Sequence, residues 1–342
     1  MNIVIFEAED WERAACEQLA RDHAVTFVGA PATADARFSE AEAISTFIDS
    51  RLDAATLAGF PKLRLISTRS TGYDHVDLTY CRDHGVSVCN VPDYGDPTVA
   101  EHAFALLLAL ARKIPDAVDH TRRGDFSQVG LRGFDLGGKT LGVVGTGQIG
   151  RRVIQIGKGF GMDVLAFDTQ PDPEVAAAMG FRYVDFDTLI AACDVLTLHI
   201  PGGAATEGLI GAEQFARMKP SAVLVNTARG GVVDAEALLN ALQTGQIAGA
   251  ALDVLSQEPW LRDEAQIFRS ATPPAPEGLR SLVASHALLK LPNVIVTPHV
   301  AYDTQEAVER IMAVTLGNIE AFAAGTPRHV VQAPLPTAHH LA

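Results

Sequence analysis

Residues 141–150 read Leu-Gly-Val-Val-Gly-Thr-Gly-Gln-Ile-Gly, an apolar run that turns directly into the pattern Gly145-x-Gly147-x-x-Gly150. The run predicts a buried strand, and the first glycine permits a tight turn from that strand into a helix. The second glycine lets backbone approach a pyrophosphate, and the third lets the helix pack closely on its strand. The stretch therefore predicts an α/β domain whose helix amides face a dinucleotide.

Asp168 makes this interpretation specific, because a glycine turn by itself is common in proteins. It ends the next apolar run, residues 163–167, eighteen positions after Gly150. A carboxylate at the end of the second strand accepts hydrogen bonds from the ribose 2′-hydroxyl. Thr169, Gln170 and Pro171 follow it, so no adjacent cation invites a 2′-phosphate. We expect the cofactor to be NAD rather than NADP.

The bulk composition limits the class of protein. A chain of 342 residues exceeds one comfortable core, which predicts two domains of about 150 residues each. Its 48% hydrophobic and 20% charged residues are typical of a globular protein. The net charge of −14 argues against nucleic-acid or anionic-membrane partners, because both are polyanions.

The cysteines and the apolar stretches indicate a cytoplasmic protein. Cys16, Cys81, Cys89 and Cys193 form no CxxC pair or metal-like cluster, so we expect reduced packing thiols and no metal. The first seven residues lack the basic start of a signal peptide and already include Glu7. The longest apolar stretch, residues 103–111, is too short to span a bilayer.

Strand-like and helix-like segments alternate in two blocks, which predicts two doubly wound α/β domains with parallel sheets covered on both faces. The first block has candidate strands at 3–6, 25–28, 43–47, 63–67 and 86–89, with helical stretches near 11–21, 54–60 and 76–84. The second has candidate strands at 140–144, 164–167, 195–199, 222–226, 249–252 and 294–297.

The segments around these blocks predict a discontinuous domain. The helix 99–112 is apolar nearly all round, so we expect it between domains or subunits. Residues 120–136 predict a long arm, either a loop or a dimer contact, and 256–290 a loop or short-helix insertion beside the site. The helix 303–323 should return to the first domain. We therefore predict domains at 1–97 plus 300–335 and at 98–299.

Polar residues end the strands of the second block, where a doubly wound sheet binds its ligands. These residues are His199, Arg229, Asp253 and His299. A nicotinamide enzyme acting on an oxo or hydroxy acid needs a cation for the carboxylate and a proton donor for the oxygen. Arginine offers a planar two-pronged donor, and histidine is the side chain whose unperturbed pKa lies nearest neutrality.

Each candidate also has a plainer interpretation. Arg229, followed by two glycines, fits a solvated loop cation, and His199, just before a proline, fits a hydrogen-bonding residue at a strand end. A carboxylate beside His299 would favour the imidazolium. Both Glu258 and Asp253 are candidates for it, and spacing alone does not choose between them; Glu258 also fits a turn residue.

Taken together, these motifs resemble the NAD-dependent D-2-hydroxyacid dehydrogenase family nearly end to end. The likeness rests on the glycine turn with Asp168, on 226–231, on 252–254 with 258–259, on 297–301, and on 70–77 and 90–102. Within the family, the Val-Pro-x-Tyr94 segment and Tyr302 are closest to the D-lactate dehydrogenase-like branch.

The resemblance implies a Rossmann NAD domain inserted into a flavodoxin-like substrate domain. It assigns substrate binding to Arg229, acid/base chemistry to His299 and support of that histidine to Glu258. The NAD site would be lined by Gly145, Gly147, Gln148, Ile149, Gly150, Asp168, Ile200, Pro201, Thr206, Thr227, Ala228, Arg229 and Asp253. The substrate, a small 2-oxo or 2-hydroxy acid, would also contact Thr71, Gly72, Tyr94 and Tyr302.

The family is usually homodimeric, which here implies contact through the helix and arm at 98–136. One departure is the segment 260–290, which is longer and richer in proline than the family pattern. The expected activity is reduction of a 2-oxo acid to a D-2-hydroxy acid and its reverse. The alternatives are a glyoxylate or hydroxypyruvate reductase, and a dimeric NAD-binding corepressor or scaffold of the same fold.

Overall fold

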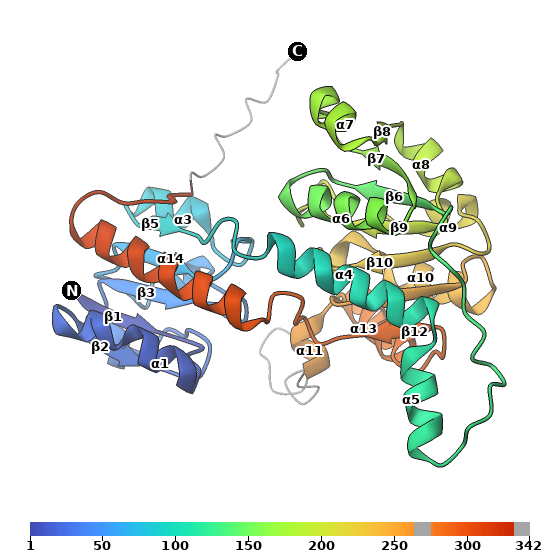
Figure 1. Cartoon of the computed structure of the whole chain (residues 1–342). Helices are drawn as coiled ribbons and strands as arrows, with labels where there is room; N and C mark the ends of the chain where they lie inside the picture. The colour runs from blue at the N-terminus through green and yellow to red at the C-terminus, as the bar shows by residue number, and fades with distance from the viewer. Residues whose placement is uncertain (263–274, 332–342) are drawn as a thin grey trace. The chain divides into compact units, whose positions relative to one another are not determined.

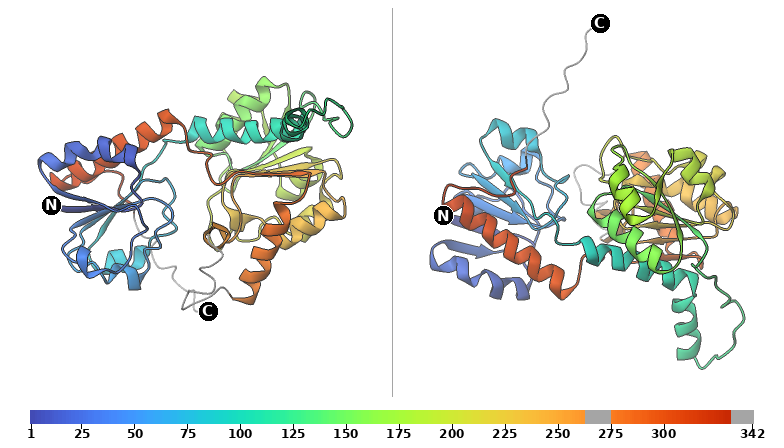
Figure 2. Two further views of the ribbon diagram at one scale, coloured as in Figure 1. Left: turned by 90° about the horizontal axis from the view of Figure 1, so that it is seen from below. Right: turned by 45° about the horizontal axis from the view of Figure 1, so that its top comes forward.

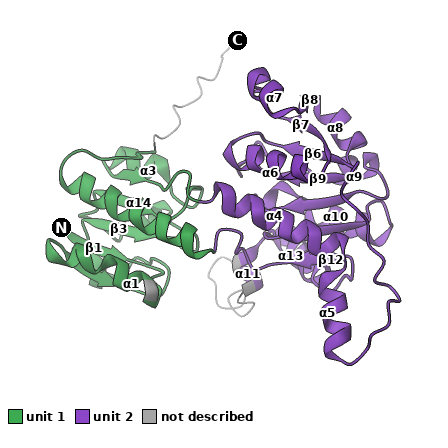
Figure 3. Ribbon diagram, in the orientation of Figure 1, with its two compact units in different colours: residues 1–94, 304–342 green, residues 95–303 purple. Residues whose placement is uncertain are grey.

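The computed structural model describes residues 1–262 and 275–331. The chain divides into two compact units (Figure 3): unit 1 is Met1–Tyr94 with Thr304–Ala342, and unit 2 is Gly95–Asp303. The junctions therefore lie at 94/95 and 303/304, within four residues of the predicted 97/98 and 299/300.

Unit 1 is built on a five-stranded sheet of order β2-β1-β3-β4-β5 (Figure 1). Each neighbouring pair is parallel, and this order is that of flavodoxin-like folds. The strands are β1 (Asn2–Ile5), β2 (Ala24–Phe27), β3 (Ala43–Thr46), β4 (Leu65–Thr68) and β5 (Ser87–Cys89).

Helices cover both faces of this sheet. One apolar cluster joins α1 (Asp10–Cys16), the 3-10 helix at Glu17–Arg21 and α14 (Gln305–Ala323) to the strands. The other involves α2 (Ala54–Leu57) and α3 (Leu78–Asp83). The helix predicted over 11–21 thus changes at Glu17 to the tighter 3-10 form. The left view of Figure 2 shows α1 and α14 lying together on one face.

Unit 2 contains a seven-stranded parallel sheet of order β12-β11-β10-β9-β6-β7-β8. Its strands are β6 (Thr140–Val144), β7 (Asp163–Phe167), β8 (Arg182–Tyr183), β9 (Val195–Leu198), β10 (Val223–Asn226), β11 (Gly249–Leu252) and β12 (Val294–Val296). From β6, the sheet grows in one direction through β7 and in the other through β9, which is the Rossmann arrangement. The predicted fold class of two doubly wound parallel-sheet domains is confirmed.

The helices of unit 2 form a layer on each side of the sheet. One cluster holds α4 (Asp96–Ala111), α6 (Gln148–Gly159) and α7 (Pro173–Met179); the other holds α8 (Phe186–Ala192), α9 (Ala212–Arg217), α10 (Ala235–Gln243) and α13 (Pro276–Leu288). The apolar helix α4, expected between domains or subunits, buries Leu106, Leu107 and Leu110 against the sheet of its own unit.

Two segments of unit 2 were predicted to be irregular. The arm predicted at 120–136 includes the last turn of α5 (Ile114–Arg122), has no helix or strand after it, and stands out from the unit in Figure 1. The insertion at 256–290 contains α11 (Glu258–Arg262) and the 13-residue α13. The prediction of a loop or short helix was therefore wrong for 276–288. Pro276 is the first residue of α13, a position where proline favours a helix. Residues 263–274 lie outside the described residues.

Candidate active site

The glycine turn has the geometry that its sequence predicts. Gly145 has a φ of 92°, and a Cβ there would lie 2.4 Å from the carbonyl oxygen of His199. A Cβ at Gly150 would lie 2.0 Å from the Gly145 oxygen, so the start of α6 packs against the turn only because Gly150 has no side chain. Gly147, the N-cap of α6, faces open space. The helix amides are therefore accessible to a phosphate at this point.

Asp168 lies beside this turn. Its Oδ2 accepts hydrogen bonds from the backbone N–H of Thr146 at 2.7 Å and from the Thr146 hydroxyl at 2.8 Å, and its Oδ1 accepts one from Gln170 N at 2.9 Å. Burial by itself would raise the pKa of this carboxyl, but the hydrogen bonds outweigh burial and hold the pKa below its ordinary value. The carboxylate is thus ionised at neutral pH.

The surrounding residues fit a dinucleotide. Thr227 Oγ1 is buried and has no hydrogen-bond partner in the part of the chain that the structure describes. A buried hydroxyl without a partner is costly, so a ligand that bonds it would remove that cost. The loop after β9 is held by a 2.8 Å bond from the Thr206 hydroxyl to the Pro201 oxygen. These groups, the open side at Gly147 and Asp168 would hold NAD.

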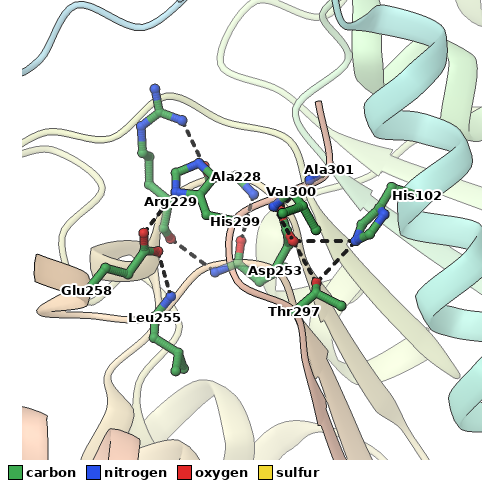
Figure 4. Close-up of polar contacts among 11 residues, drawn as sticks. His102, Ala228, Arg229, Asp253, Leu255, Glu258, Thr297, His299, Val300 and Ala301 are labelled. Atoms are coloured by element: carbon green, nitrogen blue, oxygen red, sulfur yellow. Dashed lines mark hydrogen bonds and ion pairs between the residues drawn. The ribbon is translucent and has the colours of Figure 1, made fainter. Parts of the chain in front are cut away.

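Arg229 lies on a turn that Asn226 shapes at the end of β10. Asn226 is 1% exposed; its Oδ1 accepts from Ala228 N at 3.0 Å, and its Nδ2 donates to the Arg229 oxygen at 3.0 Å. A Cβ at Gly230 would lie 2.1 Å from the Leu255 oxygen. That close approach brings the Arg229 turn against the segment that leads into Glu258 (Figure 4).

His299 and Glu258 form a hydrogen-bonded pair. Nδ1 of the imidazole lies 2.8 Å from Glu258 Oε2, and both side chains are about one-fifth exposed, at 22% and 23%. Glu258 Oε1 accepts the Leu255 N–H at 2.9 Å, which fixes the carboxylate in place. His299 itself has a φ of 58°, in the left-handed region that side chains seldom occupy. Of the two carboxylates that spacing left open, Glu258 is the one that contacts the imidazole.

Asp253 instead binds the backbone that carries His299. Its Oδ1 accepts from the Thr297 hydroxyl at 2.6 Å and Val300 N at 3.0 Å, and its Oδ2 accepts from Ala301 N at 2.8 Å. Burial raises the pKa of this carboxyl, but hydrogen bonds from His102, Thr297 and the backbone outweigh it and lower the pKa. The resemblance placed Asp253 in the cofactor site; here its side chain is 0% exposed and its carboxylate is engaged within the chain.

His199 is a hydrogen-bonding residue at a strand end. Its Nε2 lies 2.8 Å from the Thr197 hydroxyl. Burial lowers the pKa of His199 to about 3, so the ring is neutral at physiological pH. Among the residues that the structure describes, no group of three or more His, Cys, Asp or Glu side chains is placed to hold a metal ion.

Comparison with known proteins places this arrangement in a family. Residues 104–301 match the model of the D-isomer specific 2-hydroxyacid dehydrogenase NAD-binding domain. The chain belongs to the D-2-hydroxyacid dehydrogenase family. It is an NAD-dependent dehydrogenase, as the sequence predicts.

Curated relatives and a solved structure agree with that membership. A glyoxylate reductase of Thermococcus litoralis is 38% identical over 84% of this chain and 82% of its own length. A glycerate dehydrogenase of Methylorubrum extorquens is 39% identical over 82% of each chain. The structure of D-lactate dehydrogenase from Aquifex aeolicus with NAD and lactic acid is 33% identical, with a TM-score of 0.86 over 98% of this chain and 100% of that one.

In this D-2-hydroxyacid dehydrogenase, three of the expected substrate residues lie in unit 1. The Thr71 hydroxyl donates to the Val91 oxygen at 2.9 Å, and Ser70 Oγ donates to the Gly72 oxygen at 2.6 Å, so the loop is held by its own polar groups. Arg310 of α14 donates two hydrogen bonds, at 3.0 and 2.8 Å, to the backbone oxygen of Tyr94. Tyr302 belongs to unit 2.

His102 contacts the dehydrogenase site and was not among the residues that the sequence predicted for it. It lies on α4, with Nε2 3.1 Å from Thr297 Oγ1 and 3.4 Å from Asp253 Oδ1. Because the Thr297 proton goes to Asp253, the Thr297 oxygen accepts from His102. The Val99-Ala-Glu-His102 segment is part of the family resemblance, but nothing in its sequence indicates that His102 contacts Asp253 at the end of β11.

Proposed function

We propose that this enzyme reduces a small 2-oxo acid to the D-2-hydroxy acid, and catalyses the reverse, with the specificity of a D-lactate dehydrogenase. The observation that carries the proposal is the 2.8 Å contact between His299 Nδ1 and Glu258 Oε2 beside the turn that bears Arg229. A cation, a proton donor and a carboxylate that supports the donor are the groups that reduction of an oxo acid needs.

Each of the three side chains has one role. Arg229 binds the substrate carboxylate and orients the carbonyl through its planar guanidinium. The chemistry that bound NADH supplies is hydride donation to the carbonyl carbon. Imidazolium His299 gives the proton on Nε2 to the oxygen as that carbon is reduced, and it keeps the proton on Nδ1, which it donates to the Glu258 carboxylate. In oxidation, neutral His299 takes the hydroxyl proton at Nε2.

A panel of oxo acids tests the proposed substrate. Pyruvate, 2-oxobutyrate, 2-oxoisocaproate, phenylpyruvate, glyoxylate and hydroxypyruvate are each assayed with NADH, and chiral chromatography identifies the product enantiomer. We expect the highest kcat/KM for pyruvate or its short homologues, and a D product. A preference for glyoxylate or hydroxypyruvate identifies the second candidate, a glyoxylate or hydroxypyruvate reductase, which the two curated relatives favour. Absence of turnover with all six acids supports a binding platform.

We also propose a homodimer formed through α4, α5 and the arm that follows. Phe126 and Val129 lie three residues apart on the arm and are 81% and 82% exposed, and this pair of exposed apolar side chains supports a contact with a partner there. We place the enzyme in the cytoplasm. Its four cysteines are free and buried, and burial raises the pKa of Cys193 to about 12, so that thiol is inert. Among the described helices, none has the length and apolarity to cross a membrane.

A further inference from the structure

Tyr183 lies close to Asp168 because of the short edge strand β8. Tyr183 pairs in register with Ala166 of β7, two residues before Asp168. Register partners in a parallel sheet point to the same face, and so do residues two apart on one strand. The tyrosine ring is therefore on the Asp168 side of the sheet, where it packs edge-on against Phe181 at 5.1 Å.

Three polar groups form a directed chain from this ring to the carboxylate. Tyr183 OH lies 2.7 Å from Thr146 Oγ1, and Thr146 Oγ1 lies 2.8 Å from Asp168 Oδ2. The single hydroxyl proton of Thr146 goes to the ionised carboxylate, which only accepts, so Tyr183 donates to Thr146. Thr146 is 3% exposed, and hydrogen bonds in such a chain strengthen one another.

The chain restricts Asp168 to one orientation. The two bonds from Thr146 hold Oδ2, and Gln170 N donates to Oδ1. With Oδ2 held in this way, Oδ1 is presented in a fixed direction, where a ribose hydroxyl can donate to it. A 2′-phosphate at the same point meets a negative charge that cannot turn away without breaking these bonds.

We propose that Thr146 and Tyr183 are positioning residues that hold Asp168 and thereby set the preference of this enzyme for NAD over NADP. The proposal rests on the cofactor role assigned to Asp168. Arg151 is the neighbouring cation, since its Nε donates to the Thr146 oxygen at 2.8 Å, but its Nη2 lies 3.6 Å from Asp172. A 2′-phosphate would compete with Asp172 for it.

The test measures binding without any oxo acid. Dissociation constants for NADH, NADPH, ADP-ribose and 2′-phospho-ADP-ribose are measured by calorimetry for the wild type, Thr146→Val, Tyr183→Phe and Asp168→Ala. Thr146→Val keeps the side-chain shape and the backbone N–H but removes the hydroxyl. Thr188→Val is the matched control, because the Thr188 hydroxyl also donates to an aspartate, Asp185 Oδ2, at 2.6 Å on the exposed start of α8. Thermal melting shows that each variant is folded.

We expect Thr146→Val to lower the NADPH-to-NADH ratio of dissociation constants about five- to tenfold, the effect of one ordinary hydrogen bond. Tyr183→Phe acts through Thr146 and should lower it about two- to fivefold. Thr188→Val should leave it unchanged. If Asp168→Ala lowers the ratio but neither Thr146→Val nor Tyr183→Phe does, the positioning role is overturned and the role of Asp168 stands. If Asp168→Ala leaves the ratio unchanged, the cofactor role of Asp168 is overturned, and with it the positioning role of Thr146 and Tyr183. If Thr146→Val does not fold, the ratio of dissociation constants of Tyr183→Phe tests the positioning role instead.

Discussion

Nδ1 of His299 lies 2.8 Å from Oε2 of Glu258, and the second oxygen of that carboxylate is held by the backbone N–H of Leu255. The imidazole is thus fixed through the nitrogen that does not transfer the proton. Nε2 remains for the substrate, with its tautomer set by the carboxylate.

Removal of the imidazole should stop chemistry and leave cofactor binding intact. We expect His299→Ala to lower kcat by about 10²- to 10⁴-fold, the usual contribution of a positioned acid or base, with the NADH dissociation constant little changed. Steady-state kinetics and NADH fluorescence titration measure the two quantities. The exposed His84, replaced by glutamine, is the control. A turnover near that of the wild type would exclude His299 as the acid/base.

The two directions of the reaction should respond oppositely to pH. Reduction needs imidazolium His299 and should fall as pH rises, whereas oxidation needs neutral imidazole and should increase. Glu258→Gln removes the negative charge that stabilises the imidazolium, so reduction should lose more activity than oxidation. Rate profiles from pH 5.5 to 9 in both directions test this. An equal loss in both directions at every pH would leave Glu258 a purely structural residue.

Asp253 should be important for stability as well as for catalysis. In Asp253→Asn, an amide NH₂ must face groups that now donate to the carboxylate, such as the N–H of Ala301. We expect the free energy of unfolding to fall by about 2 kcal/mol or more, and kcat to fall because the His299 backbone shifts. Urea denaturation measures the free energy of unfolding, and steady-state kinetics measure kcat. Thr297→Val and the double variant complete a double-mutant cycle. Strictly additive losses would contradict a shared network.

His199 should make the fold sensitive to acid. Its ring, with an ordinary pKa of 6.5, titrates at about 3 when folded, so between these values the unfolded chain binds a proton that the folded chain does not. The free energy of unfolding therefore falls as pH drops below 6.5, by at most about 1.4 kcal/mol per pH unit for this group. His199→Gln should show a shallower slope between pH 6.5 and 5, while His84→Gln keeps that of the wild type. Identical slopes in the wild type and both variants would show that His199 does not cause the loss of stability at low pH.

Charges on the arm should dissociate the proposed dimer. We expect Phe126→Asp with Val129→Asp to give a monomer, because burying two carboxylates at an apolar contact is costly. Light scattering coupled to size-exclusion chromatography gives the mass. Val283→Asp is the control, since Val283 is also exposed, at 68%, but lies on α13. A double variant with the mass of a wild-type dimer would place the interface elsewhere.

Most strands were predictable because buried parallel strands are near-continuous apolar runs. Residues 140–144 and 249–252 have the predicted bounds, and the other predicted strands differ by one or two residues at one or both ends. The missed strand, β8, has only two residues and includes the charged Arg182, so it leaves no such run. Its absence from the prediction also concealed the proximity of Tyr183 to Asp168.

The site was predictable in its residue types but only partly in its contacts. Arg229, Asp253 and His299 follow strand ends, and that placement identifies them. Two partners of the Asp253 carboxylate are the backbone N–H groups of Val300 and Ala301, which every sequence possesses and no pattern reveals. His102 reaches the same carboxylate from α4 across 151 positions of chain.

The discontinuity of unit 1 has a consequence for synthesis on the ribosome. Residues 1–94 carry all five strands of their sheet, but α14, which covers one face of it together with α1, is made only after unit 2. Until Met312, Leu316 and Ile319 arrive, the apolar side chains beneath them, including Leu65, face water. Val331, which donates to the Val88 oxygen at 2.7 Å, arrives later still. Unit 2 is made in one stretch and can fold before unit 1 is complete, so the nascent chain carries an exposed apolar surface until α14 is synthesised.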